Sequence, residues 1–78
     1  MSEAVVVHVF HLVDNSWGVC LSDGSFRYFC KARGKRAAVG KWEAHFGLEA
    51  TKMITYQGRC SPSIMAVTMA SLVEEADG

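Results

Sequence analysis

The chain has 78 residues, of which 50% are hydrophobic and 21% are charged, a balance that excludes an intrinsically disordered chain. Its length allows one small domain over residues 1–78, and no apolar run reaches the roughly 18 residues that cross a bilayer. The formal net charge is zero, which argues against a protein that binds any polyanion indiscriminately.

Residues 4–13 (AVVVHVFHLV) predict a first strand that is apolar on both faces. The segment is rich in β-branched residues and is followed by Asp14-Asn15, which we interpret as a two-residue turn into the next strand. In that register one face of the strand holds Val6, His8, Phe10 and Leu12.

Residues 16–30 predict a β-hairpin. Asp23-Gly24 suits the centre of a type I′ turn, because both central positions need positive φ angles. This turn sets Val19 opposite Tyr28, and the alternation of side chains along a strand then assigns the faces. The face expected to join the apolar side of the first strand holds Trp17, Val19, Leu21, Phe26, Tyr28 and Cys30.

The reverse face of this predicted sheet is also apolar. Either other parts of the chain cover both faces, or the reverse face meets a partner. A chain this short has little length with which to cover both. We interpret the reverse face as a surface for a protein partner or for a second copy in a homodimer. Its residues are Val5, Val7, Val9, His11 and Phe29.

The second half of the chain predicts a helix, a strand and another helix. Residues 34–46 place Val39, Trp42 and Phe46 on one helical stripe, and residues 51–58 predict a fourth strand. Residues 61–76 predict the second helix, with Ser61 as the N-cap. Its expected buried stripe is Met65, Met69, Leu72, Val73 and Ala76, widened by Ile64 and Val67. The order βββαβα indicates an α+β domain with two helices packed on a mainly antiparallel sheet.

Residues 34–42 (GKRAAVGKW) come close to the spelling of a phosphate-binding loop but lack its spacing. A Walker A loop has four residues between its glycines and a hydroxyl residue after the lysine. Here five residues separate Gly34 from Gly40, and Trp42 stands in place of the hydroxyl residue. We therefore exclude a nucleotide-hydrolysing site and assign the stretch to the start of the helix.

Residues 27–41 form a basic block that contains six cations and no acid. Cations at the start of a helix oppose its dipole, and a bound anion relieves that opposition. The block therefore predicts a solvated junction, a contact for an acidic protein patch, or a contact for nucleic acid. The candidate binding residues are Lys31, Arg33, Lys35, Arg36 and Lys41.

No set of residues predicts catalysis, a cofactor or a metal site. His8 and His11 are three apart on a strand, so they point to opposite faces and cannot chelate one ion together; His8 fits a hydrogen-bonded residue of the core or its rim. Cys60 precedes the second helix, where a thiol pKa can be lowered, but no base is near it in sequence. Three cysteines are an odd number, which favours a reduced, cytoplasmic setting.

We therefore expect a small non-catalytic interaction protein that binds a macromolecule, with a protein as the first choice of partner. Its size and lack of motifs are also typical of phage-encoded inhibitors of host machinery, such as anti-CRISPR proteins. The alternative is a nucleic-acid-binding module that uses the basic block from Lys31 to Lys41. A cysteine-dependent enzyme using Cys60 is a remote third hypothesis.

Overall fold

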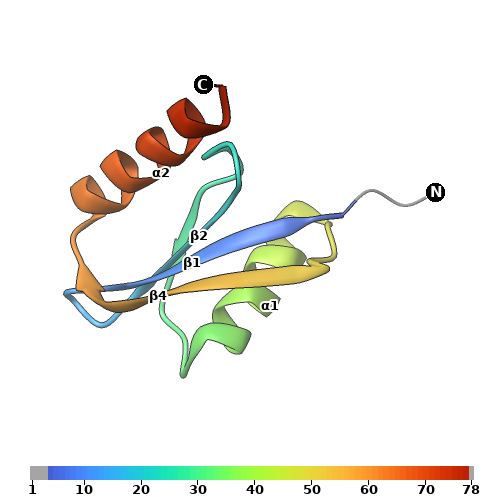
Figure 1. The fold of residues 1–78 in the computed structure, drawn as a ribbon. Coiled ribbons are helices and arrows are strands. Elements are labelled where there is room, and N and C mark those ends of the chain that lie inside the picture. Colours follow the sequence, from blue (N-terminus) through green and yellow to red (C-terminus); the bar gives the residue numbers. More distant parts are fainter. Residues whose placement is uncertain (1–3, 78) are drawn as a thin grey trace.

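The computed structural model describes residues 4–77, and it describes the side chains of residues 4–71. The predicted order of strands and helices is confirmed (Figure 1). The elements are β1 (Val6–Leu12), β2 (Trp17–Leu21), β3 (Tyr28–Cys30), α1 (Lys35–Phe46), β4 (Lys52–Cys60) and α2 (Pro62–Asp77).

The four strands form one mixed sheet in the order β3-β2-β1-β4. β2 pairs antiparallel with both β1 and β3, whereas β4 pairs parallel with β1. The two helices lie on opposite sides of this sheet, with α1 below it and α2 above it in Figure 1. The protein is thus a small α+β domain whose central strand, β1, is covered on both faces.

The core between α1 and the sheet is built around Trp42, whose side chain is fully buried. Its indole Nε1 donates a hydrogen bond to the Phe26 carbonyl at 2.7 Å. Gly47 ends the helix in the left-handed region, with φ 68, where glycine has no Cβ to clash. The predicted positions of Val39 and Trp42 in the core are confirmed. The buried members of this cluster are Val7, Val9, Val19, Ala38, Val39 and Trp42.

The core between α2 and the sheet is smaller and depends on Met65 and Met69. The helix starts as predicted, because the Ser61 hydroxyl oxygen accepts a hydrogen bond from the Ile64 N–H at 3.2 Å. The wider predicted stripe is wrong, since Ile64 and Val67 are exposed. The side chains of Leu72, Val73 and Ala76 lie outside the described residues. The buried members are Phe10, Leu12, Cys20, Met65 and Met69.

Both hairpin turns are one residue longer than predicted, and both follow the pattern Leu-x-Asp-(Asn or Gly)-Ser. In residues 12–16 the N–H of Leu12 donates to the Ser16 carbonyl, and Asn15 takes a positive φ of 72. Residues 21–25 repeat these bonds, with Gly24 at φ 83. This is a three-residue loop, in which a left-handed residue follows a type I turn.

The longer first turn reverses the predicted faces of β1. Val9 lies opposite Val19 and His8 lies opposite Cys20, whereas a two-residue turn would shift the pairing by one residue. Because side chains alternate, a shift of one residue moves every side chain to the other face. The predicted grouping of Val6, His8, Phe10 and Leu12 with Trp17 and Val19 is therefore wrong.

The second hairpin keeps its predicted register despite the longer turn. Val19 pairs with Tyr28 and Trp17 pairs with Cys30. One extra residue is accommodated between the turn and β3 at Phe26, whose φ is 56. The two departures from the predicted hairpin cancel, and Tyr28 and Cys30 stay on the expected face.

Gly18 of β2 allows α2 to approach the sheet closely, and replacing it with alanine is expected to destabilise the protein. A Cβ at Gly18 would lie 2.6 Å from the Met65 Sδ and 3.1 Å from a ring carbon of Phe29. Overpacking of this kind costs about 1–3 kcal/mol of unfolding free energy, measurable by urea denaturation. Gly40→Ala is the matched control, because a Cβ there meets open space and alanine favours a helix. Equal stability of Gly18→Ala and the wild type would contradict the packing of Met65 on β2.

Candidate functional site

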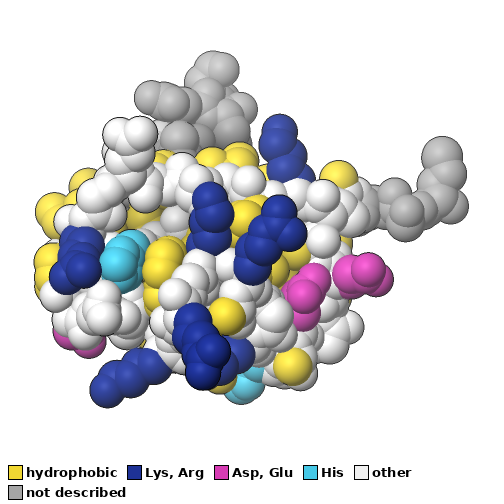
Figure 2. Space-filling model, turned by 90° about the horizontal axis from the view of Figure 1, so that it is seen from below, with side chains coloured by type: hydrophobic (Ala, Val, Ile, Leu, Met, Phe, Trp, Pro, Cys, Tyr) yellow, Lys and Arg dark blue, Asp and Glu magenta, His cyan; other side chains and the backbone are white. Residues whose placement is uncertain are grey.

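One end of the sheet gathers the basic residues. β1, β3 and β4 end there, and β2, α1 and α2 begin there. All six cations at this end are exposed, and Asp14 in the β1–β2 turn is the carboxylate that the structure describes beside them. The local charge is therefore +5, and Figure 2 shows several Lys and Arg side chains on the side of the molecule that α1 covers. We call this region the basic end; its cations are Lys31, Arg33, Lys35, Arg36, Lys41 and Arg59.

The segment between β3 and α1 is fixed to its neighbours by side chains. The Trp17 indole Nε1 donates to the Ala32 carbonyl at 3.2 Å, and the Lys41 Nζ donates to the Lys31 carbonyl. Gly34 is the N-cap of α1 and supplies no side-chain hydrogen bond. The backbone that carries the predicted basic block is thus held against the sheet, while the charged groups project from it.

A bulge in β4 opens a groove within the basic end. Thr55 pairs with Val9 and Arg59 pairs with His11, so residues 56–58 lie opposite the single residue Phe10. Gly58 takes a φ of 77 in this bulge, and bulges of this kind redirect side chains next to binding sites. The groove beside it has a volume of about 350 Å³. We call it the basic groove; its lining includes His11, Trp17, Lys35, Thr55, Gly58 and Arg59.

Two stacked rings and two cations define the chemistry of the basic groove. The rings of His11 and Trp17 are nearly parallel, with centroids 4.3 Å apart and 5° between their planes. His11 Nε2 is also 2.9 Å from the Asn15 Oδ1, which fixes the ring. Lys35 comes from the start of α1 and Arg59 from β4. A guanidinium can pair with a carboxylate or phosphate through two hydrogen bonds, so this arrangement can hold an anionic group against an apolar wall.

The groove combines residues from two separately predicted surfaces. Lys35 belongs to the predicted basic block and His11 to the predicted apolar face, and the structure places both on one groove. Arg59 and Trp17 were not predicted as site residues. Arg59 lies beyond the predicted end of the fourth strand, and only the parallel pairing of β4 with β1 brings it beside His11.

The predicted apolar partner face is wrong for Val7 and Val9. Their side chains are 0% and 1% exposed, because the longer first turn points them toward α1, which covers them. Val5 is half-buried against the same core. Phe29 is 46% exposed but lies on the opposite face, near Met65 and Gly18. The five predicted residues therefore form no common surface, and the burial of Val7 and Val9 removes the basis for a homodimer through that face.

The thiols lie in surroundings that disfavour the thiolate. Burial raises the pKa of Cys60 and that of Cys30, and it raises the pKa of Cys20 to about 11. An activated nucleophile needs the opposite shift, so the raised pKa of Cys60 does not support a reactive thiol there. Among the described residues, no group of three or more His, Cys, Asp or Glu side chains could hold a metal ion.

His8 is a hydrogen-bonded core residue, as predicted. It is 6% exposed, its Nδ1 lies 2.7 Å from the Tyr56 hydroxyl, and its Nε2 lies 3.2 Å from the Ser22 hydroxyl. The Tyr56 ring in turn stacks on Phe10, with centroids 4.3 Å apart. Both nitrogens are thus satisfied by neutral groups, and burial lowers the pKa of His8.

We expect the protein to become less stable as the pH is lowered, because of His8. The unfolded chain takes up a proton at His8 near its ordinary pKa of about 6.5, whereas the folded chain does so only at lower pH. The stability that neutral His8 provides is present above about pH 6.5 and is lost as the pH falls toward the lowered folded pKa. Urea unfolding at pH 7.5 and 5.5 measures the loss, and His8→Gln should reduce the difference between the two. If the difference in stability between pH 7.5 and pH 5.5 is the same in His8→Gln as in the wild type, another group causes the pH dependence.

Of the helices in the described part of the chain, none has both the length and the hydropathy to cross a membrane. Comparison with known proteins found no matching family, no matching curated protein and no matching solved structure.

Proposed function

We propose that this protein is a non-catalytic binding protein whose basic end binds an acidic segment of a protein partner, with the basic groove as the centre of the contact. The observation that carries the proposal is the convergence of Lys35 and Arg59, from two different elements, on a groove lined by the His11–Trp17 stack. In such a contact a carboxylate of the partner pairs with the cations, and its apolar portion packs on the rings.

The charge distribution supports a protein partner over nucleic acid. The +5 charge is confined to one end, and the net charge of the whole chain is zero. Toward the other end of the sheet, Asp23, Glu43 and Glu49 outnumber the cations Arg27 and Lys52, so this end offers a long polyanion no net attraction. A groove of about 350 Å³ also suits one or two acidic side chains better than a backbone with many phosphates.

We also propose a cellular location and a biological role for the protein. The three cysteines are free, which supports a reducing, cytoplasmic location. Inhibition of host machinery by a phage-encoded protein is one role that a small binding protein of this kind would serve, and it stays a prediction.

Affinity capture with three forms of the protein tests the proposed function. The baits are the wild type, the Lys35→Glu/Arg59→Glu variant, and Arg27→Glu/Lys52→Glu, which has the same net charge as that variant but is altered away from the basic end. We expect the wild type and the control to retain the same protein from an extract of the source cells, and the basic-groove variant to lose it. Equal capture by all three baits would contradict the proposal. Loss of capture after nuclease treatment would favour nucleic acid instead.

A further inference from the structure

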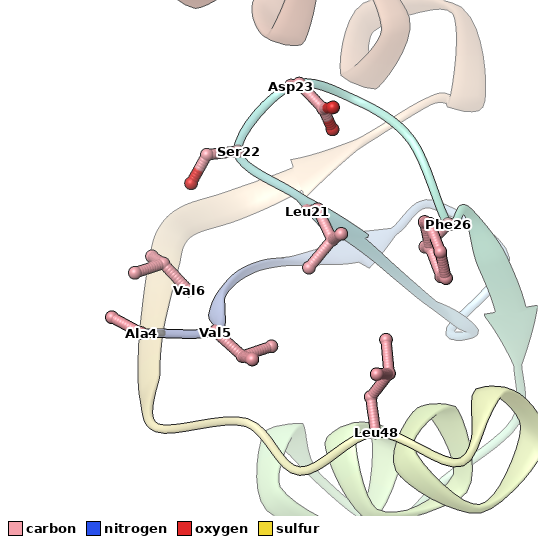
Figure 3. Close-up of a pocket in the computed structure, with 8 residues that line it drawn as sticks. All are labelled: Ala4, Val5, Val6, Leu21, Ser22, Asp23, Phe26 and Leu48. Carbon is pink, nitrogen blue, oxygen red and sulfur yellow. The ribbon is translucent and has the colours of Figure 1, made fainter. Parts of the chain in front are cut away.

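A second pocket lies at the opposite end of the sheet from the basic groove. It is an open pocket with a volume of about 450 Å³, bordered by the start of β1, the end of β2, the turn that follows β2, and the segment after α1 (Figure 3). Figure 3 shows four apolar side chains that point into it from these segments, namely Val5, Leu21, Phe26 and Leu48. We call it the Phe26 pocket.

Phe26 occupies a backbone position that does not favour a large side chain. Its φ of 56 lies in the left-handed region, which glycine and asparagine enter more readily than an aromatic residue. The hydrogen bond from the Trp42 Nε1 to the Phe26 carbonyl holds this conformation. The ring packs partly on Phe46, with centroids 5.0 Å apart, yet it remains 44% exposed. Strained backbone of this kind is frequent where a side chain is presented to a ligand.

Among the described residues that line the Phe26 pocket, Asp23 carries a negative charge. The Asp23 carboxylate accepts hydrogen bonds from the backbone N–H and the hydroxyl of Ser25, and these bonds lower its pKa, so it is ionised at neutral pH. Arg27 directs its Nε to the Gly24 carbonyl and does not line the pocket. Of the described residues that line the pocket, Asp23 is therefore the one whose charge faces a ligand.

We propose that the Phe26 pocket binds a small apolar cation, that is, an aromatic or branched alkyl group that carries an ammonium. The apolar part fills the space between Val5, Leu21 and Leu48. The ammonium lies near the Asp23 carboxylate and the exposed ring of Phe26, where ionic and cation–π attraction act together. This site is separate from the basic end, so the proposal stands whether or not the proposed acidic protein partner is found.

A titration followed by amide NMR tests the pocket, with phenethylammonium as the probe. Neutral 2-phenylethanol and anionic phenylacetate are matched ligands with the same ring. We expect saturable shifts of the Leu21, Phe26 and Leu48 amides, and binding of the ammonium at least about threefold tighter than binding of the alcohol. Absence of saturable shifts, or equal affinity for phenylacetate, would overturn the proposal. Shifts of these amides that depend on protein concentration alone would also overturn the proposal, because a second copy of the protein would then fill the pocket.

Two variants separate the parts of the proposed contact. Asp23→Asn keeps the acceptor for Ser25 and should remove the preference for the ammonium over the alcohol. Phe26→Asn suits the left-handed backbone and should abolish binding of both ligands while the amide spectrum remains that of a folded protein. Val67→Asn replaces an apolar side chain that is exposed on α2 and should leave binding unchanged. An ammonium preference that persists in Asp23→Asn would contradict the role of the carboxylate.

Discussion

Replacing Trp42 with alanine is expected to lower the free energy of unfolding by about 3–5 kcal/mol. Trp42 is fully buried between α1 and the sheet, and its cluster includes the central β1 residues Val7 and Val9. Removing the ring leaves a cavity and also removes the hydrogen-bond donor to the Phe26 carbonyl. Small domains have only about 5–15 kcal/mol of total stability, so this variant should be close to unfolding at room temperature.

Urea denaturation followed by the fluorescence of the remaining Trp17 measures this loss. Trp42→Phe is the matched control, because it keeps an apolar ring and removes only the N–H donor and part of the volume. Trp42→Phe should lower the free energy of unfolding clearly less than Trp42→Ala does. About 1–3 kcal/mol of its loss comes from the unsatisfied Phe26 carbonyl if that group stays buried. A loss below about 1 kcal/mol for Trp42→Ala would contradict the docking of α1 on β1 and β2.

Reversing the two cations of the basic groove is expected to weaken the binding of an acidic peptide. The Lys35→Glu/Arg59→Glu variant is expected to bind an octaglutamate peptide at least about tenfold more weakly than the wild type, because two attractive charges become repulsive. Trp17 lines the groove, so its fluorescence reports the titration directly. Binding by the wild type should also weaken as salt is raised from about 0.05 M to 0.5 M, since these exposed charges are screened.

The control for this titration is Arg27→Glu/Lys52→Glu, which reverses two exposed charges toward the other end of the sheet. Its affinity for the peptide should stay within about threefold of that of the wild type, because neither residue lines the basic groove and salt screens exposed charges. Equal weakening by both double variants would mean that the peptide responds to net charge and not to the groove.

The sequence patterns predicted the elements better than their pairing. The Ser61 cap and the Val39–Trp42 stripe are local features, and both are confirmed. The faces of β1 were assigned wrongly because Asp14-Asn15 suggested a two-residue turn. The repeated pattern in residues 12–16 and 21–25 was a visible signal that both turns share one geometry, and it fixes the register once the loop length is known.

The candidate site could be predicted only in part, because it depends on pairing between distant segments. Lys35 was recognisable from the cluster of cations before and within the first turn of α1. Arg59 reaches His11 only because β4 runs parallel to β1 and contains a bulge, and nothing local in residues 52–60 specifies either feature. The same pairing, together with the turn geometry, explains why an apolar strand that suggested an exposed face is instead buried on both sides.

The role of the basic groove is best tested by mapping where an acidic peptide binds to the wild-type protein. Amide NMR with octaglutamate should give saturable shifts at His11, Trp17, Lys35 and Arg59, and little change at Leu21, Phe26 or Leu48. An oligothymidylate of equal charge should bind more weakly. Shifts confined to the opposite end of the sheet, or tighter binding of the oligonucleotide at the basic groove, would mean that this groove is not a site for an acidic protein segment.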